Sequence, residues 1–272
     1  MISYISFRYF IFMRKMLLIP STFTGEKKDI KIRNFLISQV ARAAVTFGIN
    51  EIGVYYDKDP KFDSHGLGRY IVKVLKYLNT PPYIRKIAFP IEKDLKEIGS
   101  CLPIKARYHY DRSRYTYVYV LDKKEDLYRV TDGSIEFEVK SKKKYKSNIL
   151  IYDKNKKEFV EKYETEIYFG YEVFYYNKPL EKLLNKLKKE NFLIIGTSKL
   201  GEDIRKVNFK TKNNIAIAFG SFARGFEDIW KENFKEMFDI VINSVPDQQI
   251  ESIRTEEAIF YTLALLRYKN II

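Results

Sequence analysis

Residues 16–56 read MLLIPSTFTGEKKDIKIRNFLISQVARAAVTFGINEIGVYY, and this stretch decides the fold. The apolar runs at 16–20 and 52–56 are short and bounded by polar residues, so each predicts a strand. Between them, residues 29–47 carry apolar side chains at helical spacing, and Gly48 is placed to end that helix as a C-cap. A strand, a helix and a second strand in this order predict a parallel sheet.

The same alternation returns in the C-terminal part of the chain. Strands are predicted at 170–175, 192–195, 215–219 and 238–242, and helices at 68–78, 179–190 and from Thr255 onward. The last three strands run into small or polar residues. Because ligands of open parallel sheets bind beyond the carboxyl ends of the strands, we expect a cofactor there. The candidate cofactor residues at these three ends are Thr197, Ser198, Gly220, Ser221, Gly225, Asn243 and Val245.

The start of the last predicted helix adds further candidates. Thr255 is expected to be its N-cap, with Glu256 and Glu257 in the first turn, where carboxylates interact favourably with the helix dipole. A helix N-terminus beside a cofactor loop presents free backbone N–H groups. The candidates here are Ser252, Ile253, Arg254 and Thr255.

A different pattern fills residues 104–166, between the α/β segments 16–103 and 167–272. Short alternating runs at 115–121, 127–130, 135–139 and 149–152 are separated by turn residues such as those at 131–133. Several short strands in so few residues predict a small inserted β-barrel of the OB type. The expected fold class is therefore α/β, a parallel sheet with an OB-like insertion.

The charge of the chain favours a polyanionic partner. Lys and Arg number 49 against 35 Asp and Glu, which gives a formal charge of +14. In the insertion, a lysine cluster and three alternating tyrosines are candidates for RNA binding through phosphate contacts and base stacking. They are Lys140, Lys142, Lys143, Lys144, Lys146, Tyr115, Tyr117 and Tyr119. The alternative for the lysines is an ordinary solvated turn.

Several kinds of protein are disfavoured by the sequence. The segment 220–225 has the glycine spacing of a P-loop, but Phe226 and Glu227 replace its Lys-Ser/Thr. Two histidines and one cysteine argue against a zinc site and against Ser-His-Asp chemistry. Because Cys101 has no partner for a disulfide within the chain, we expect a cytoplasmic protein. Residues 1–15 are too short for a membrane span and are expected to be a disordered or misannotated leader.

Three motifs resemble those of the SPOUT methyltransferases. Residues 40–54 (VARAAVTFGINEIGV) are similar to the first, 217–225 (IAFGSFARG) to the second and 243–258 (NSVPDQQIESIRTEEA) to the third. The IRTEEA ending, the TPPYIRK segment at 80–86 and the predicted barrel resemble the RNA methyltransferase subfamily of archaea and eukaryotes that carries an OB-like insertion.

This resemblance implies a trefoil-knotted parallel sheet, S-adenosylmethionine as cofactor, ribosomal or transfer RNA as substrate, and a homodimer with its cofactor pocket beside the dimer interface. It also implies a catalytic role for Arg42, in contacting a substrate phosphate or developing negative charge. No metal or membrane partner is implied. Phe222 stands where many members carry glutamate, and the asparagine that commonly precedes the arginine of the first motif has no clear match, Asn34 being its candidate. These departures leave a non-catalytic RNA-binding or ribosome-assembly factor as the alternative.

Overall fold

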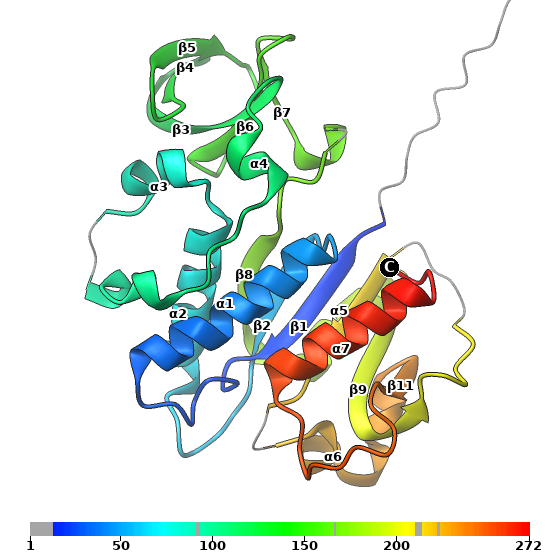
Figure 1. The fold of residues 1–272 in the computed structure, drawn as a ribbon. Coiled ribbons are helices and arrows are strands. Elements are labelled where there is room, and N and C mark those ends of the chain that lie inside the picture. The colour runs from blue at the N-terminus through cyan, green and yellow to red at the C-terminus, as the bar shows by residue number, and fades with distance from the viewer. Residues whose placement is uncertain (1–12, 91–92, 166, 210–213, 222–223) are drawn as a thin grey trace, which may run out of the picture.

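The protein consists of a six-stranded parallel sheet flanked by helices and a smaller antiparallel sheet beyond one end of it (Figure 1). The computed structural model describes residues 13–90, 93–165, 167–209, 214–221 and 224–272. None of the helices formed by these residues is both long and apolar enough to cross a membrane.

The parallel sheet confirms the expected α/β class. Its strand order is β11-β9-β10-β1-β2-β8, and every neighbouring pair is parallel. The strands are β1 (Lys15–Pro20), β2 (Glu51–Tyr56), β8 (Glu172–Pro179), β9 (Phe192–Asp203), β10 (Asn214–Ala218) and β11 (Ile240–Asn243).

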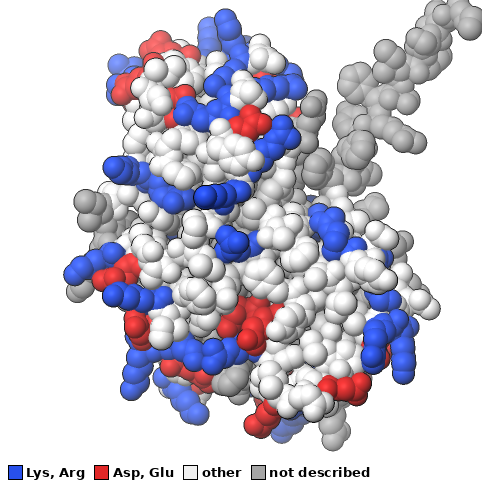
Figure 2. All heavy atoms as spheres, viewed as in Figure 1, with Lys and Arg blue, Asp and Glu red and all other residues white. Residues whose placement is uncertain are grey.

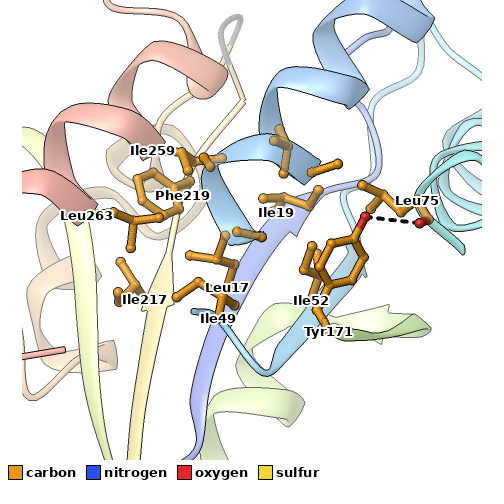
Figure 3. Packing of buried hydrophobic residues seen from close by; sticks show 14 of the residues in the cluster. Leu17, Ile19, Ile49, Ile52, Leu75, Tyr171, Ile217, Phe219, Ile259 and Leu263 are labelled. Carbon is orange, nitrogen blue, oxygen red and sulfur yellow. Dashed lines mark hydrogen bonds between the residues drawn. The ribbon is translucent and has the colours of Figure 1, made fainter. Parts of the chain in front are cut away.

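Helices cover both faces of this sheet. The helices α1 (Ile30–Thr46), α2 (Ser64–Asn79) and α7 (Thr255–Tyr268) share a core cluster with one face, and α5 (Leu180–Lys189) and α6 (Phe226–Trp230) share a cluster with the other. Strand β1 sends Leu17 and Ile19 to the first cluster, shown in Figure 3, and Met16 and Leu18 to the second. Full burial of each such side chain contributes about 2 kcal/mol. This two-sided burial explains why the strands read as continuous apolar runs.

The antiparallel sheet forms a curled lobe within the segment expected to hold an inserted barrel (Figure 1). Its order is β5-β4-β3-β6-β7. The strands are β3 (Tyr115–Lys124), β4 (Leu127–Thr131), β5 (Glu136–Lys140), β6 (Ile149–Asp153) and β7 (Glu158–Val160). Four of them correspond to the predicted runs. The sequence analysis missed β7, whose three residues are too few to show a period.

Short helices link the two parts. They are α3 (Pro82–Ala88), α4 (Arg107–Tyr110) and the 3₁₀ turns Lys93–Leu95, Ile98–Ser100 and Lys162–Glu164. A fourth 3₁₀ turn, Lys231–Met237, lies within the parallel part, between α6 and β11. The turn between β4 and β5 packs so closely on α3 that a Cβ at Gly133 would collide with the Tyr83 carbonyl oxygen. Gly133 also has a φ of +83°, which favours glycine. The lobe is therefore held against α3 by backbone fit.

The lobe packs on the parallel part through two of the tyrosines predicted to stack on RNA. Tyr115 and Tyr117 are 6% and 4% exposed and share a core cluster with Ile84 and Phe169. The Tyr117 hydroxyl donates to the Phe169 carbonyl at 2.6 Å. Their proposed role in base stacking is therefore wrong. Of the three tyrosines, Tyr119 alone is partly exposed.

Candidate functional site

A cavity of about 350 Å³ lies at the carboxyl ends of β9, β10 and β11, beside the N-terminus of α7. It brings together ten of the eleven residues that the sequence proposed for the cofactor. These are Thr197, Ser198, Gly220, Ser221, Gly225, Asn243, Val245, Ser252, Ile253 and Thr255. Arg254, the eleventh, is exposed and is not among the lining residues.

Hydrogen bonds tie the cavity walls to one another. The Thr197 hydroxyl donates to the Ala218 carbonyl at 3.0 Å, which joins the middle of β9 to the end of β10. Asn243 donates through Nδ2 to the Lys199 carbonyl at 3.0 Å, which joins β11 to the segment after Gly196. Strand β9 continues to Asp203, but its register against β11 shifts after Gly196. Thr197 and Ser198 thus leave the regular sheet where the cavity begins.

The helix α7 begins at Thr255, as the sequence suggested, but its N-cap is the preceding residue. Arg254 is the N-cap, and Thr255 is the first helical residue. The Arg254 backbone N–H donates to a carboxylate oxygen of Glu257 at 3.1 Å. The Thr255 hydroxyl instead donates to the Gly220 carbonyl at 2.9 Å, so it fastens the helix to the end of β10. The predicted N-cap role of Thr255 is therefore wrong. Thr255 lines the cavity because its hydroxyl is bonded to the end of β10.

The turn after β10 is closed on itself. The Ser221 hydroxyl and backbone N–H each lie 3.1 Å from the Arg224 carbonyl oxygen and donate to it. A Cβ at Gly225 would lie 2.6 Å from the carboxylate of Glu227, so a side chain there would push that group away. Glycine at 225 therefore lets this carboxylate lie against the backbone at the cavity wall.

A buried ion pair beside this turn escaped the sequence analysis. Asp57, 4% exposed, directly follows β2, accepts a hydrogen bond from the Thr22 hydroxyl and forms an ion pair with Arg224, which lines the cavity. The Arg224 Nε is buried and has no hydrogen-bond partner among the described residues. The polar residues after β1 and β2 follow the same strand-end rule that identified the other wall residues, so this rule could have found Asp57.

The ionisable groups at the cavity carry both signs of charge. Lys199 and Arg224 line it together with Glu227, Asp228 and Glu251. Asp228 accepts from the Gly225 backbone N–H at 2.7 Å. Near the wall, burial raises the pKa of Glu256 in the first turn of α7. Within the described residues, no group of three or more His, Cys, Asp or Glu side chains is placed to hold a metal ion.

The lining suits S-adenosylmethionine in size and chemistry. A cavity of 350 Å³ falls in the range of small-molecule sites. Hydroxyl and amide side chains can serve an adenosine group. Side chains of both charges can serve a methionyl group that carries a carboxylate, an ammonium and a sulfonium.

The remaining candidates lie outside this cavity. Arg42 is exposed on α1, and its Nη1 donates to the Pro103 carbonyl at 2.6 Å. Asn34, the candidate for the asparagine that commonly precedes the motif arginine, is buried and hydrogen bonded to Tyr70 and to the Glu97 carbonyl. The five lysines of the cluster are all exposed in and beside the turn between β5 and β6. Phe222 lies outside the described residues.

Comparison with known proteins identifies the family. A model of the family described as "Putative RNA methyltransferase" matches residues 15–266. The chain belongs to this family. The match confirms the resemblance inferred from the three motifs. In this member, those motifs form the end of α1 with β2, then β10 with its turn, and finally the segment that runs from the end of β11 into α7.

Two curated relatives are named as methyltransferases of ribosomal RNA. A 28S rRNA (uridine-N(3))-methyltransferase of Drosophila melanogaster is 26% identical over 92% of this chain, which spans 61% of the fly protein. The Homo sapiens protein of the same name is 24% identical over 92% of this chain and 76% of its own length. Among solved structures, an AdoMet-bound rRNA methyltransferase from Sinorhizobium meliloti is similar to 94% of this chain over 56% of its own length. The two chains are 10% identical, and the TM-score is 0.42. This score is too low to support a conclusion.

The Asp57 pair generates a stability prediction. Asp57→Asn should lower the free energy of unfolding by about 2 kcal/mol or more, because it leaves the Arg224 guanidinium without its counter-charge in a partly buried place. Urea denaturation measures this loss. Asp122→Asn, at an exposed carboxylate on β3, is the control with the same change of charge. Equal stability of the two variants would contradict the proposed role of the pair.

Proposed function

We propose that this protein is an S-adenosylmethionine-dependent RNA methyltransferase that acts on ribosomal RNA, with N3 of a uridine as the acceptor. The observation that carries the proposal is that ten predicted cofactor residues line one cavity in a member of this family. The acceptor is supported by the names of the fly and human relatives.

The proposed reaction transfers a methyl group in line from a positively charged sulfur, which S-adenosylmethionine supplies when bound. A carbon–sulfur bond breaks, a carbon–nitrogen bond forms, and the uridine nitrogen gives up its proton to solvent or to a nearby base. The chain's own residues hold the reactants in line. The wall formed by Thr197, Gly220 and Asn243 fixes the cofactor, and Arg42 stabilises negative charge on the acceptor.

The finer features of the fold belong to the same proposal. We propose that the connections around β10 and β11 form the trefoil knot of the SPOUT proteins and that the curled lobe is an OB-like barrel. The lobe is proposed to provide RNA affinity through its lysines and not to take part in chemistry. A cytoplasmic location is the remaining part of this proposal.

The proposed site is completed by a second copy of the chain. Arg42 does not line the cavity of its own chain. It shares an outward stripe of α1 with Ile32 and Phe35, which are 46% and 41% exposed. The neighbouring helix α7 exposes Tyr261 by 45% and Tyr268 by 85%, and Figure 2 shows a broad area over this helix without charged side chains. A homodimer through this face would bury these groups and bring Arg42 toward the partner's cavity.

Isothermal titration with S-adenosylmethionine tests the proposed function. We expect one saturable site, competition by S-adenosylhomocysteine, and loss of binding in Gly225→Val, whose side chain would displace the Glu227 carboxylate. Gly99→Val is the control, because a Cβ added at Gly99 would meet no atom within 4 Å. If the protein as isolated took up no S-adenosylmethionine, a non-catalytic RNA-binding factor would be the better description.

Light scattering tests the homodimer. The expected mass is twice the 32.4 kDa of one chain. Phe35→Glu with Tyr261→Glu should give monomers, because carboxylates would then be buried without partners in the interface. A fully active monomer would count against the shared site.

Arg42→Ala tests the proposed catalytic contact. Methyl transfer should fall by about a hundredfold, the scale of losing one transition-state contact, while S-adenosylmethionine binding stays near wild type. Single-turnover kinetics on RNA measures the rate of methyl transfer, and isothermal titration measures the binding of S-adenosylmethionine. Because the Arg42 guanidinium also bonds the Pro103 carbonyl, thermal unfolding is recorded alongside. An active Arg42→Ala enzyme would remove this residue from the mechanism.

A further inference from the structure

A second cavity, of about 520 Å³, lies where the lobe meets the parallel part. We call it the junction cavity. Its walls come from the end of α2, the start of β8, the strands β3, β6 and β7, and the turn between β5 and β6. It therefore joins segments that are far apart in the sequence, and it is separate from the cavity at the carboxyl ends of β9, β10 and β11.

The charge of the junction cavity is positive. Five lysines line it against two carboxylates, Glu161 and Glu172. Glu161 pairs with Lys143, and Glu172 lies 3.6 Å from the ammonium of Lys162. Both carboxylates are therefore already neutralised. Burial lowers the pKa of Lys162, whose ammonium also donates to the Tyr171 carbonyl at 3.3 Å.

Three lysines remain unpaired at the rim. Lys76, Lys144 and Lys146 are exposed, and none forms an ion pair with any residue that the structure describes. Lys76 comes from the last turn of α2, and the other two come from the lysine cluster of the lobe. Cations from two separate parts of the protein thus face one hollow. An anion in that hollow would be held from both sides.

The inner wall is apolar and aromatic. Phe89 and Tyr145 are half-buried, and Val173 is the third residue of that kind in the lining. An ammonium rim over such a wall matches a nucleotide, which has an anionic phosphate and a flat, weakly polar base. It matches an acidic peptide less well, because carboxylate side chains would leave the apolar wall without a partner.

We propose that the junction cavity binds a nucleotide of single-stranded RNA, with its phosphate at Lys76, Lys144 and Lys146 and its base on the apolar wall. This inference rests on RNA being the substrate, as in the proposed function. The proposal assigns only part of the lysine cluster to this site, because Lys140 and Lys142 do not line the cavity.

Fluorescence anisotropy with a labelled single-stranded RNA of mixed sequence tests the site in the full-length protein. Replacing Lys76, Lys144 and Lys146 by Ala should weaken binding by about tenfold or more at moderate salt. It should also reduce the slope of log Kd against log salt by about 0.7, the contribution of one phosphate contact on single-stranded RNA. Lys144→Ala with Lys146→Ala should cost more affinity than Lys140→Ala with Lys142→Ala, which removes the same charge from the same region. Lys76→Ala alone should also weaken binding.

Two results would overturn the proposal. One is an equal loss of affinity for the two lysine pairs together with no effect of Lys76→Ala, and the other is wild-type RNA binding by the triple variant.

Cross-linking with RNA that contains 4-thiouridine locates the bound base on the protein. Cross-links should fall on peptides that contain Phe89 or Tyr145, and cross-links found only elsewhere would contradict the site. Titration of the triple variant with S-adenosylmethionine separates the test of the RNA site from the test of the proposed function. If neither the wild type nor the variant bound S-adenosylmethionine, the proposed function would be rejected, and the measured RNA affinities would still stand.

Discussion

Burial of both faces of the parallel sheet is the constraint on which the rest of the structure depends. Because α1, α2 and α7 cover one face and α5 and α6 the other, polar groups within the strands would be cut off from water. Chemistry can therefore be placed only where the strands end. At the carboxyl ends the chain carries threonine, serine, glycine and asparagine, and these residues surround the proposed cofactor cavity.

The amino ends of the strands carry the lobe instead. The Tyr168 hydroxyl, from the segment that leaves the lobe, donates to the carbonyl of Ile49, just before β2. The Tyr108 hydroxyl, on α4, donates to Oδ1 of Asn79 at the end of α2 at 2.7 Å. Together with the packing of Gly133 on α3, these bonds hold the lobe against the parallel part. The insertion therefore adds a second surface without disturbing the strand ends that form the cofactor cavity.

The sequence predicts this architecture well wherever burial is periodic, and less well where a residue's partner is remote. Apolar runs located the parallel strands, and the strand-end rule located most of the cavity wall. The burial of Tyr115 and Tyr117 could not be seen, because both faces of β3 are packed, one against Phe169 and the other, through Val118, against a second cluster. Alternation reveals two faces but not what covers each. The pairing of Asp57 with Arg224 was missed because the two residues are distant in sequence.

The arrangement of the two cavities bears on how many chains one reaction needs. Helix α1 runs antiparallel to the strands, so its C-terminal half, which carries Arg42, lies toward their amino ends and the lobe. The cofactor cavity lies at the opposite edge of the same sheet. An RNA held in the junction cavity and near Arg42 therefore approaches one chain at the edge away from its own cofactor residues. In the proposed dimer, pairing through α1 and α7 would let RNA bound by one chain meet the cofactor of the other.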